Sequence, residues 1–124
     1  MNPPARDARL RRHVRLRLLL GDEIAFGPGK ADLLEAIDRH GSISSAAKSL
    51  EMSYRRAWLL VDTMNQCFEQ PLVKSAKGGS GGGGAEVTEQ GREVLAAFRS
   101  LQAELDRAVD ARLAQFESRL RRRR

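Results

Sequence analysis

The chain has few of the residues from which disulfide frameworks, metal sites and membrane spans are built. Its single cysteine, Cys67, excludes a disulfide framework and a thiolate zinc cluster, which favours the reduced cytoplasm. The two histidines, His13 and His40, have no second ligand three or four residues further on, so we expect no metal site. The apolar segment at residues 14–20 is too short for a membrane span and lacks a signal-peptide cleavage pattern. We therefore expect a cytoplasmic protein without membrane contact.

The sequence also lacks the residue sets of enzymes. It contains no paired acid and base that would support proton transfer. The glycine run at residues 78–84 has no Gly-Lys-Ser/Thr ending, which argues against a nucleotide-hydrolysing phosphate loop. We predict no catalytic residue, no enzymatic activity and no cofactor.

Positive charge is abundant but unevenly placed. Residues 1–20 hold six arginines and one acid, and residues 119–124 hold five arginines, whereas the other 98 residues have a net charge of −4. The overall charge of +6 thus predicts only a salt-sensitive attraction of the two ends to polyanions. Within residues 44–80, however, five basic side chains face three acidic ones, so this segment is locally positive.

Composition and periodicity divide the chain into four regions. We predict a disordered basic arm at 1–12, a mainly α-helical DNA-binding domain at 13–91, a long dimerisation helix at 92–120 and a basic tail at 121–124. The domain begins with alternating apolar and basic residues at 14–20, which predict a strand with one buried face. A helix over residues 30–40 follows, with Leu33, Leu34 and Ile37 on one face and Gly41 as its left-handed end.

Residues 41–68 have the pattern of a helix-turn-helix. A short helix closes at Leu50, and Ser53 begins a second helix that runs to about Phe68. Glu51 occupies the turn position where glycine is usual, at a cost on the order of 1 kcal/mol. The buried stripe of the second helix consists of Ala57, Val61, Met64 and Phe68.

The start of that second helix is where we expect DNA contact, since this end meets base edges in the major groove. Ser44 and Ser53 are expected first as helix caps, with phosphate contact as an added role, and the pattern favours a core position for Trp58 over DNA contact. Leu59, on the outer face, is expected to touch a neighbouring element. The predicted DNA-binding residues are Ser44, Lys48, Ser53, Tyr54, Arg55, Arg56, Trp58, Lys77, Gly78, Gly79 and Ser80.

Two short strands at residues 72–77 and 85–87 flank the glycine run. By composition alone the run is a flexible linker. The flanks are too short to belong to separate domains, and glycine lets backbone amides approach a phosphate closely. This favours a β-hairpin wing with Lys77 at its base.

From Thr88 the pattern predicts one helix to about Leu120. Its apolar positions recur every 3.7 residues on average, which is about the period of a straight helix. A small head cannot bury such a stripe, so we expect a second copy of the chain to cover it, although the first two turns can pack on their own domain. The predicted dimer interface consists of Phe98, Leu101, Leu105, Val109, Leu113 and Phe116.

Several strings of residues resemble one family. The segments Gly41-Ser42-Ile43-Ser44, Ser53-Tyr54-Arg55-Arg56-Ala57-Trp58 and Pro71-Leu72-Val73, together with the double-glycine wing, are similar to the winged-helix domain of molybdate-responsive (ModE-type) regulators, itself LysR-like. The resemblance implies dimeric regulators that bind palindromic operators through the second helix and the wing. Full-length members carry C-terminal oxyanion-binding modules, and we expect no such molybdate-sensing module in this chain.

The favoured interpretation is a homodimeric bacterial regulator on a pseudo-palindromic duplex. The resemblance implies control of molybdenum genes, and the small-molecule effector is left open. One alternative is a non-specific architectural protein that binds DNA through its arginine-rich ends. Another is an oxyanion-binding or adaptor protein of molybdenum metabolism, although no oxyanion pocket is evident in the sequence.

Overall fold

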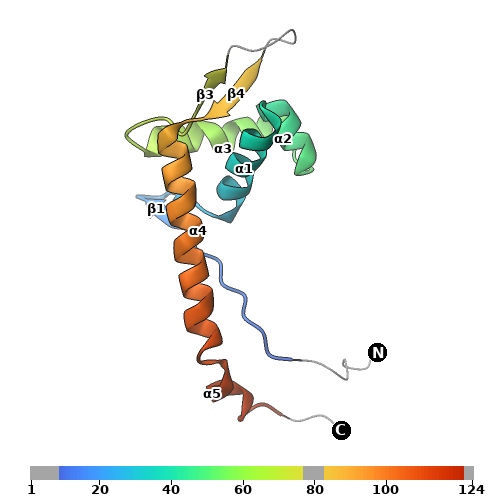
Figure 1. The fold of residues 1–124 in the computed structure, drawn as a ribbon, viewed down its shortest axis with the longest axis vertical. Helices are drawn as coiled ribbons and strands as arrows, with labels where there is room; N and C mark the ends of the chain where they lie inside the picture. Colours follow the sequence, from blue (N-terminus) through green and yellow to red (C-terminus); the bar gives the residue numbers. More distant parts are fainter. Residues whose placement is uncertain (1–8, 77–82, 122–124) are drawn as a thin grey trace. The chain divides into compact units, whose positions relative to one another are not determined.

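A computed structural model describes residues 9–76 and 83–121 of the chain. The described residues form two compact units, a head that spans Arg15–Arg99 and a smaller unit made of residues 9–14 and 100–121. Helices dominate the head, and two short hairpins complete it (Figure 1). In the described part, no helix has both the length and the apolar character to cross a membrane.

The head begins with a hairpin where a single strand over residues 14–20 was predicted. β1 (Leu18–Leu20) pairs antiparallel with β2 (Glu23–Phe26). Gly21 makes the turn between them at a φ of 60°, a left-handed conformation that glycine adopts without steric cost. The strand is therefore shorter than predicted, and β2 was not predicted.

The expected burial of this strand is also only partly correct. Leu16, just before β1, packs against the core, but Leu18 and Leu20 are 39% and 57% exposed. A bulge between Leu18 and Leu19 shifts the register, so the alternation that starts at Leu16 does not continue through β1.

Three helices follow the hairpin. They are α1 (Pro28–His40), α2 (Ile43–Ser49) and α3 (Tyr54–Cys67). The apolar stripe of α1 is fully buried, and Gly41 ends this helix in the left-handed conformation, as the sequence predicts. The small residues Ala46 and Ala47 of α2 are buried where the helices pack together.

The turn between α2 and α3 has the predicted left-handed residue, since Glu51 adopts a φ of 56°. Ser53 caps α3 as predicted, but Ser44 does not cap α2. That role belongs to Ser42, whose Oγ accepts a hydrogen bond from the N–H of Ser45 at 3.0 Å. Ser44 lies exposed in the first turn because α2 begins one residue before it.

The predicted wing is present up to its tip. β3 (Val73–Ala76) and β4 (Gly84–Val87) pair antiparallel, with Lys74 opposite Glu86. The N–H of Ala85 donates to the carbonyl of Gly41 at 2.9 Å, which ties β4 to the junction of α1 and α2. The tip lies outside the described residues.

The aromatic residues of the core join α4 to the head. Phe26 of β2 packs edge-on against Phe98 of α4 at 5.0 Å and against Phe68 at 6.2 Å, measured between ring centroids. Phe98 is only 3% exposed, so its assignment to the dimer interface is wrong: this side chain already has its partners within the head.

The last long helix ends earlier than predicted. α4 (Glu89–Asp110) is followed by a turn and by the short α5 (Leu113–Glu117), so no continuous helix reaches Leu120. The N–H of Arg112 bonds the carbonyl of Val109, three residues back, which tightens the chain at the end of α4. No residue of α5 is buried, so no packing within the described chain holds it in line with α4.

The last residue of the predicted disordered arm, Arg12, is held by ion pairs. Arg12 pairs with Asp110 at 2.9 Å and with Asp106 at 3.4 Å, both on the last turn and a half of α4. The bond to Asp110 raises the pKa of the Arg12 guanidinium. Residues 1–8 of the predicted arm, and 122–124 of the predicted tail, lie outside the described residues.

Candidate nucleic-acid interface

The amino-terminal end of α3 presents an arginine pair to solvent. Ser53 caps this end, and its Oγ accepts a hydrogen bond from the N–H of Arg56 at 3.1 Å. Ala57 is completely buried, which fixes the rotation of the helix and leaves Arg55 and Arg56 exposed. The buried stripe agrees with its prediction, since Val61 and Met64 continue it along the helix.

Two aromatic residues occupy one flank of α3. Tyr54 is 56% exposed and Trp58 is 47% exposed. The core position favoured for Trp58 is therefore wrong. Successive residues of a helix are about 100° apart, so Trp58 lies at the edge of the stripe that Ala57 defines and not within it. Leu59, expected against a neighbouring element, is 48% exposed.

Tyr54 and Trp58 line a hollow of about 490 Å³ between α2, α3 and the base of the wing, which we call the wing hollow. Ser44 lies in its wall, so three predicted DNA-binding residues meet there. The described residues that line it are Ile43, Ser44, Tyr54, Trp58, Val61, Asn65, Val73, Lys74, Ser75, Gly83, Gly84 and Ala85.

Asn65 fixes the position of the wing relative to α3. Its Oδ1 accepts hydrogen bonds from the N–H groups of Leu72 at 2.8 Å and Val73 at 3.2 Å, and its Nδ2 donates to the carbonyl of Val73 at 3.0 Å. One amide thus satisfies three backbone groups at the start of β3. No local pattern predicts this function of Asn65, because the bonds join residues on different elements.

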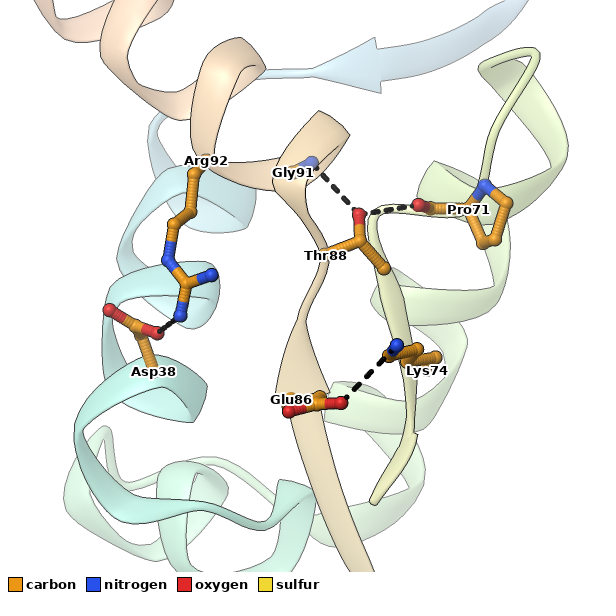
Figure 2. Close-up of polar contacts among 7 residues, drawn as sticks. All are labelled: Asp38, Pro71, Lys74, Glu86, Thr88, Gly91 and Arg92. Atoms are coloured by element: carbon orange, nitrogen blue, oxygen red, sulfur yellow. Dashed lines mark hydrogen bonds and ion pairs between the residues drawn. The ribbon is translucent and has the colours of Figure 1, made fainter.

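The base of the wing is closed by polar contacts that Figure 2 shows. Lys74 and Glu86 form a cross-strand ion pair at 3.4 Å. Thr88 begins α4 as predicted: its Oγ1 accepts from the N–H of Gly91 at 3.0 Å and donates to the carbonyl of Pro71 at 2.7 Å. The start of α4 is thus bonded to the segment that leads into β3.

Gly91 allows this close approach. A Cβ at this position would lie 2.4 Å from the carbonyl oxygen of Leu72 and 2.7 Å from a methyl carbon of Val87. Because the nearest atom belongs to the backbone, no side-chain rotation can make room for it.

Ion pairs hold α4 against α1. Arg99 pairs with Glu35 at 2.7 Å and with Asp32 at 2.9 Å, and Arg92 pairs with Asp38 at 2.8 Å (Figure 2 shows the last). The hydrogen bond from Arg99 lowers the pKa of the Glu35 carboxyl, and the same bond raises the pKa of Arg99. Each of these pairs is partly exposed, so each contributes about 0–1 kcal/mol.

Arg56 does not share the wing hollow with Tyr54 and Trp58. It lines a smaller cleft together with Arg15, Arg17 and Lys30 at the start of α1. Lys30 is only 6% exposed, and no function was predicted for it from the sequence. Burial lowers the pKa of the Lys30 ammonium, with Arg56 and Arg17 acting in the same direction and Cys67 and Glu23 opposing.

The remaining predicted DNA-binding residues lie at the edges of this surface or beyond it. Lys48 is exposed on α2. Lys77, Gly78, Gly79 and Ser80 are outside the described residues.

The remaining residues of the predicted dimer interface are accessible. Leu101 is 40% exposed and Phe116 is 59% exposed. Leu105, Val109 and Leu113 are partly buried.

These features define the class of protein. A short helix, a left-handed turn, a second helix with an exposed and capped start, and a β-hairpin beside it make a winged helix-turn-helix domain.

The family follows from comparison with known proteins. The chain belongs to the lysR family of bacterial regulatory helix-turn-helix proteins, whose family model matches residues 30–92. The matched segment runs from Lys30 of α1 to the first turn of α4 and includes the whole helix-turn-helix and the wing.

Similar curated proteins carry names from molybdenum biology. The molybdenum-pterin-binding protein MopA of Rhodobacter capsulatus is 48% identical over 83 residues, which are 67% of this chain and 31% of MopA. The molybdenum transport protein ModE of Azotobacter vinelandii is 47% identical over 69% of this chain and 32% of its own length. The dual regulator ModE of Escherichia coli K12 is 37% identical over 78% and 37% of the two chains. The chain thus spans about a third of the length of these relatives.

Solved structures agree on the fold. The DNA-binding domain of CbnR, solved in complex with DNA, superimposes with a TM-score of 0.54 at 20% identity and covers 70% of this chain and 94% of that one. Full-length LysG of Corynebacterium glutamicum superimposes with a TM-score of 0.50 at 28% identity over 71% of this chain and 30% of its own.

Proposed function

We propose that this chain is a sequence-specific DNA-binding transcriptional regulator that acts as a homodimer on a pseudo-palindromic operator. The observation that carries the proposal is the exposed, capped start of α3 beside the wing. α3 enters the major groove, where Arg55 contacts a base edge, and the wing lies along the neighbouring backbone or minor groove. As a bacterial DNA-binding regulator, it acts in the cytoplasm.

Apolar surface supports the homodimer. Leu101, Leu105 and Val109 recur every four residues along the end of α4, and Leu113 and Phe116 follow on α5; all five are exposed or half-buried. A second copy of the chain would cover these residues of its partner through two-fold symmetry. Two heads paired in this way bind half-sites that are about one helical turn of DNA apart, or a multiple of it.

The names of the relatives support a narrower proposal. Two relatives, 48% and 47% identical to this chain, are named for molybdenum-pterin binding and molybdenum transport, and a third, 37% identical, is named a DNA-binding transcriptional dual regulator. We propose genes of molybdate transport or molybdenum metabolism as the regulated set. The expectations that the chain has no enzymatic activity and carries no cofactor stay predictions.

Selection of bound duplexes from a random pool tests the function. We expect an enriched inverted repeat, which would give the operator, its symmetry and its half-site spacing together. Arg55→Ala should weaken binding to that operator by about 1–3 kcal/mol and relax the preference at one base pair, whereas Arg107→Ala on α4 should bind like the wild type. Identical discrimination between operator and scrambled duplex by wild type and Arg55→Ala would remove Arg55 from base recognition.

The architectural alternative is distinguished by removal of the arginine-rich ends. If a chain without residues 1–12 and 121–124 keeps its preference for the selected repeat, the recognition lies in the head. Loss of all duplex binding on this deletion would instead assign binding to the ends, and sedimentation of the full chain at increasing concentration tests the dimer separately.

A further inference from the structure

The cleft that contains Arg56, which we call the amino-end cleft, has the composition of an anion site. It measures about 130 Å³ and lies where the first turn of α1 meets α3 and the segment before β1. Its cations are Arg15, Arg17, Lys30 and Arg56, and no acidic residue is among the described residues that line it.

These four cations are not neutralised by ion pairs with the described residues. In the described part of the chain, none of them makes an ion pair. Like charges gathered around one small space repel one another, and the repulsion is relieved when an anion occupies that space.

The start of α1 directs backbone donors to the same place. No side chain caps this end, and Pro28 in the first helical position has no N–H. The N–H groups of Gly29 and Lys30 are therefore the donors of the first turn, and within the described chain neither has an acceptor. Free amides at the positive end of a helix dipole favour an anion.

Lys30 supplies an independent indication of a ligand. Its side chain lines the cleft, is 94% buried because it is only 6% exposed, and has no hydrogen bond or ion pair within the described residues. Desolvation is the main cause of the lowered pKa of Lys30, and Cys67 and Glu23 offset it only in part. No buried side-chain nitrogen or oxygen among the described residues lacks a partner, so the unpaired Nζ of Lys30 keeps contact with solvent at the cleft. An anion in the cleft would pair with it there.

The glycines leave room at this point. A Cβ on Gly27 would lie 3.3 Å from the Arg17 side chain, so this glycine lets the Arg17 segment approach α1. A Cβ on Gly29 would meet nothing within 4 Å, so the space before the first turn is open. The volume equals that of about four water molecules, which is below the usual range of pockets for drug-sized ligands.

We propose that the amino-end cleft binds one tetrahedral oxyanion group of the phosphate or sulfate type, held by Lys30, by the surrounding arginines and by the N–H groups of Gly29 and Lys30. The group comes either from a phosphodiester of bound duplex DNA or from a free inorganic ion. The sulfate test below does not depend on the proposed DNA-binding function.

The first experiment titrates the full chain with sodium sulfate, with chloride withdrawn to hold the ionic strength constant. Amide NMR spectra should show saturable shifts at Gly29 and Lys30. They should show none at Gly91, whose N–H at the start of α4 is already bonded to Thr88.

The matched variants are Lys30→Met, which keeps the apolar stem of the side chain, and Arg39→Met near the other end of α1. Lys30→Met should weaken sulfate binding about tenfold or more, and Arg39→Met should not change it. Thermal melts of both variants establish that they are folded.

A duplex of random sequence distinguishes the two sources of the anion. If the duplex displaces sulfate from Gly29 and Lys30, and Lys30→Met weakens duplex binding equally for all sequences, the ligand is a DNA phosphodiester. If the sulfate shifts persist with duplex bound, the ligand is a free ion. Two results would overturn the proposal. In the first, the wild type shows no saturable sulfate shifts and binds duplex with the same affinity as Lys30→Met. In the second, folded Lys30→Met binds sulfate as tightly as the wild type.

Discussion

Two hollows lie on opposite sides of α3, and they differ in the chemistry of their walls. The wing hollow is lined mainly by aromatic, amide and small side chains, and the cation among its described residues, Lys74, is paired with Glu86. The amino-end cleft collects four cations without a carboxylate among its described lining. Tyr54 and Arg56 are two residues apart, so they point about 200° apart around the helix. One helix thus separates a surface suited to contacts through shape from a surface suited to binding negative charge.

The largest expected change in stability comes from removing the Asn65 hydrogen bonds beside the wing hollow, which leaves the amino-end cleft untouched. Asn65→Leu would leave the N–H groups of Leu72 and Val73 without their acceptor, and we expect a loss of about 2–4 kcal/mol in the free energy of unfolding. Urea unfolding measures this, and Gln66→Leu, next to it on the exposed face, should cost less than about 1 kcal/mol. Sulfate binding at the amino-end cleft should be unchanged; a parallel loss there would mean that the two hollows are not independent.

Glycines at the starts of two helices give the next contrast. Gly91→Ala forces a Cβ onto the Leu72 carbonyl and should destabilise the head by about 1–3 kcal/mol, more than any gain in helix propensity. Gly29→Ala at the cleft meets open space and should stay within about 0.5 kcal/mol of the wild type. Thermal unfolding of the two variants checks the difference, and equal costs would contradict the close packing described at Gly91.

Salt dependence should separate the two sides of α3. Arg56→Ala should weaken duplex binding by about 1 kcal/mol and reduce the slope of log affinity against log salt by about 1. Trp58→Ala should weaken binding by a similar amount without a change of slope, because it removes no charge. Fluorescence anisotropy at several salt concentrations measures this. If log affinity has the same slope against log salt for both variants, the two surfaces do not differ in their contact with charge.

The smallest effects concern two titrating residues of α1. Glu35 has a lowered pKa, so its contribution, less than about 1 kcal/mol, is complete above its ordinary value of 4.5 and is lost as the pH falls through the lowered pKa. Lys30 changes stability in the same direction, but at alkaline pH. Its lowered pKa means that the unfolded chain binds the proton more tightly, so stability rises as the pH increases from that pKa towards 10.5. Unfolding across pH should show the acid loss diminished in Glu35→Gln and the alkaline rise absent in Lys30→Met; unchanged profiles would count against both assignments.

Local patterns in the sequence predicted most of the fold. The stripes of α1 and α3, the caps at Ser53 and Thr88, and the left-handed Glu51 were predictable because each depends on residues within one or two helical turns. The paired strands of the wing followed from glycines between two short apolar segments.

Contacts between distant segments escaped prediction. Phe98 belongs to the core because Phe26, 72 residues earlier, packs against it, and the helix pattern alone cannot distinguish that partner from a second chain. The amino-end cleft escaped for the same reason, since Arg15, Arg17, Lys30 and Arg56 come from three segments and form no motif. Their unfavourable electrostatics appears only when the burial of Lys30 is known.

The hairpin at the start of the head has a consequence for handling the protein. β1 exposes three consecutive leucines, Leu18–Leu20, and within the described chain only one of its edges is paired. Such an edge can recruit strands from other molecules, and charged residues beside it act as gatekeepers against aggregation. Arg15 and Arg17 lie just before these leucines, so neutralising them would both remove two of the four cations of the amino-end cleft and lower the solubility of the chain. Lys30, outside the hairpin, lets the cleft be altered without that penalty.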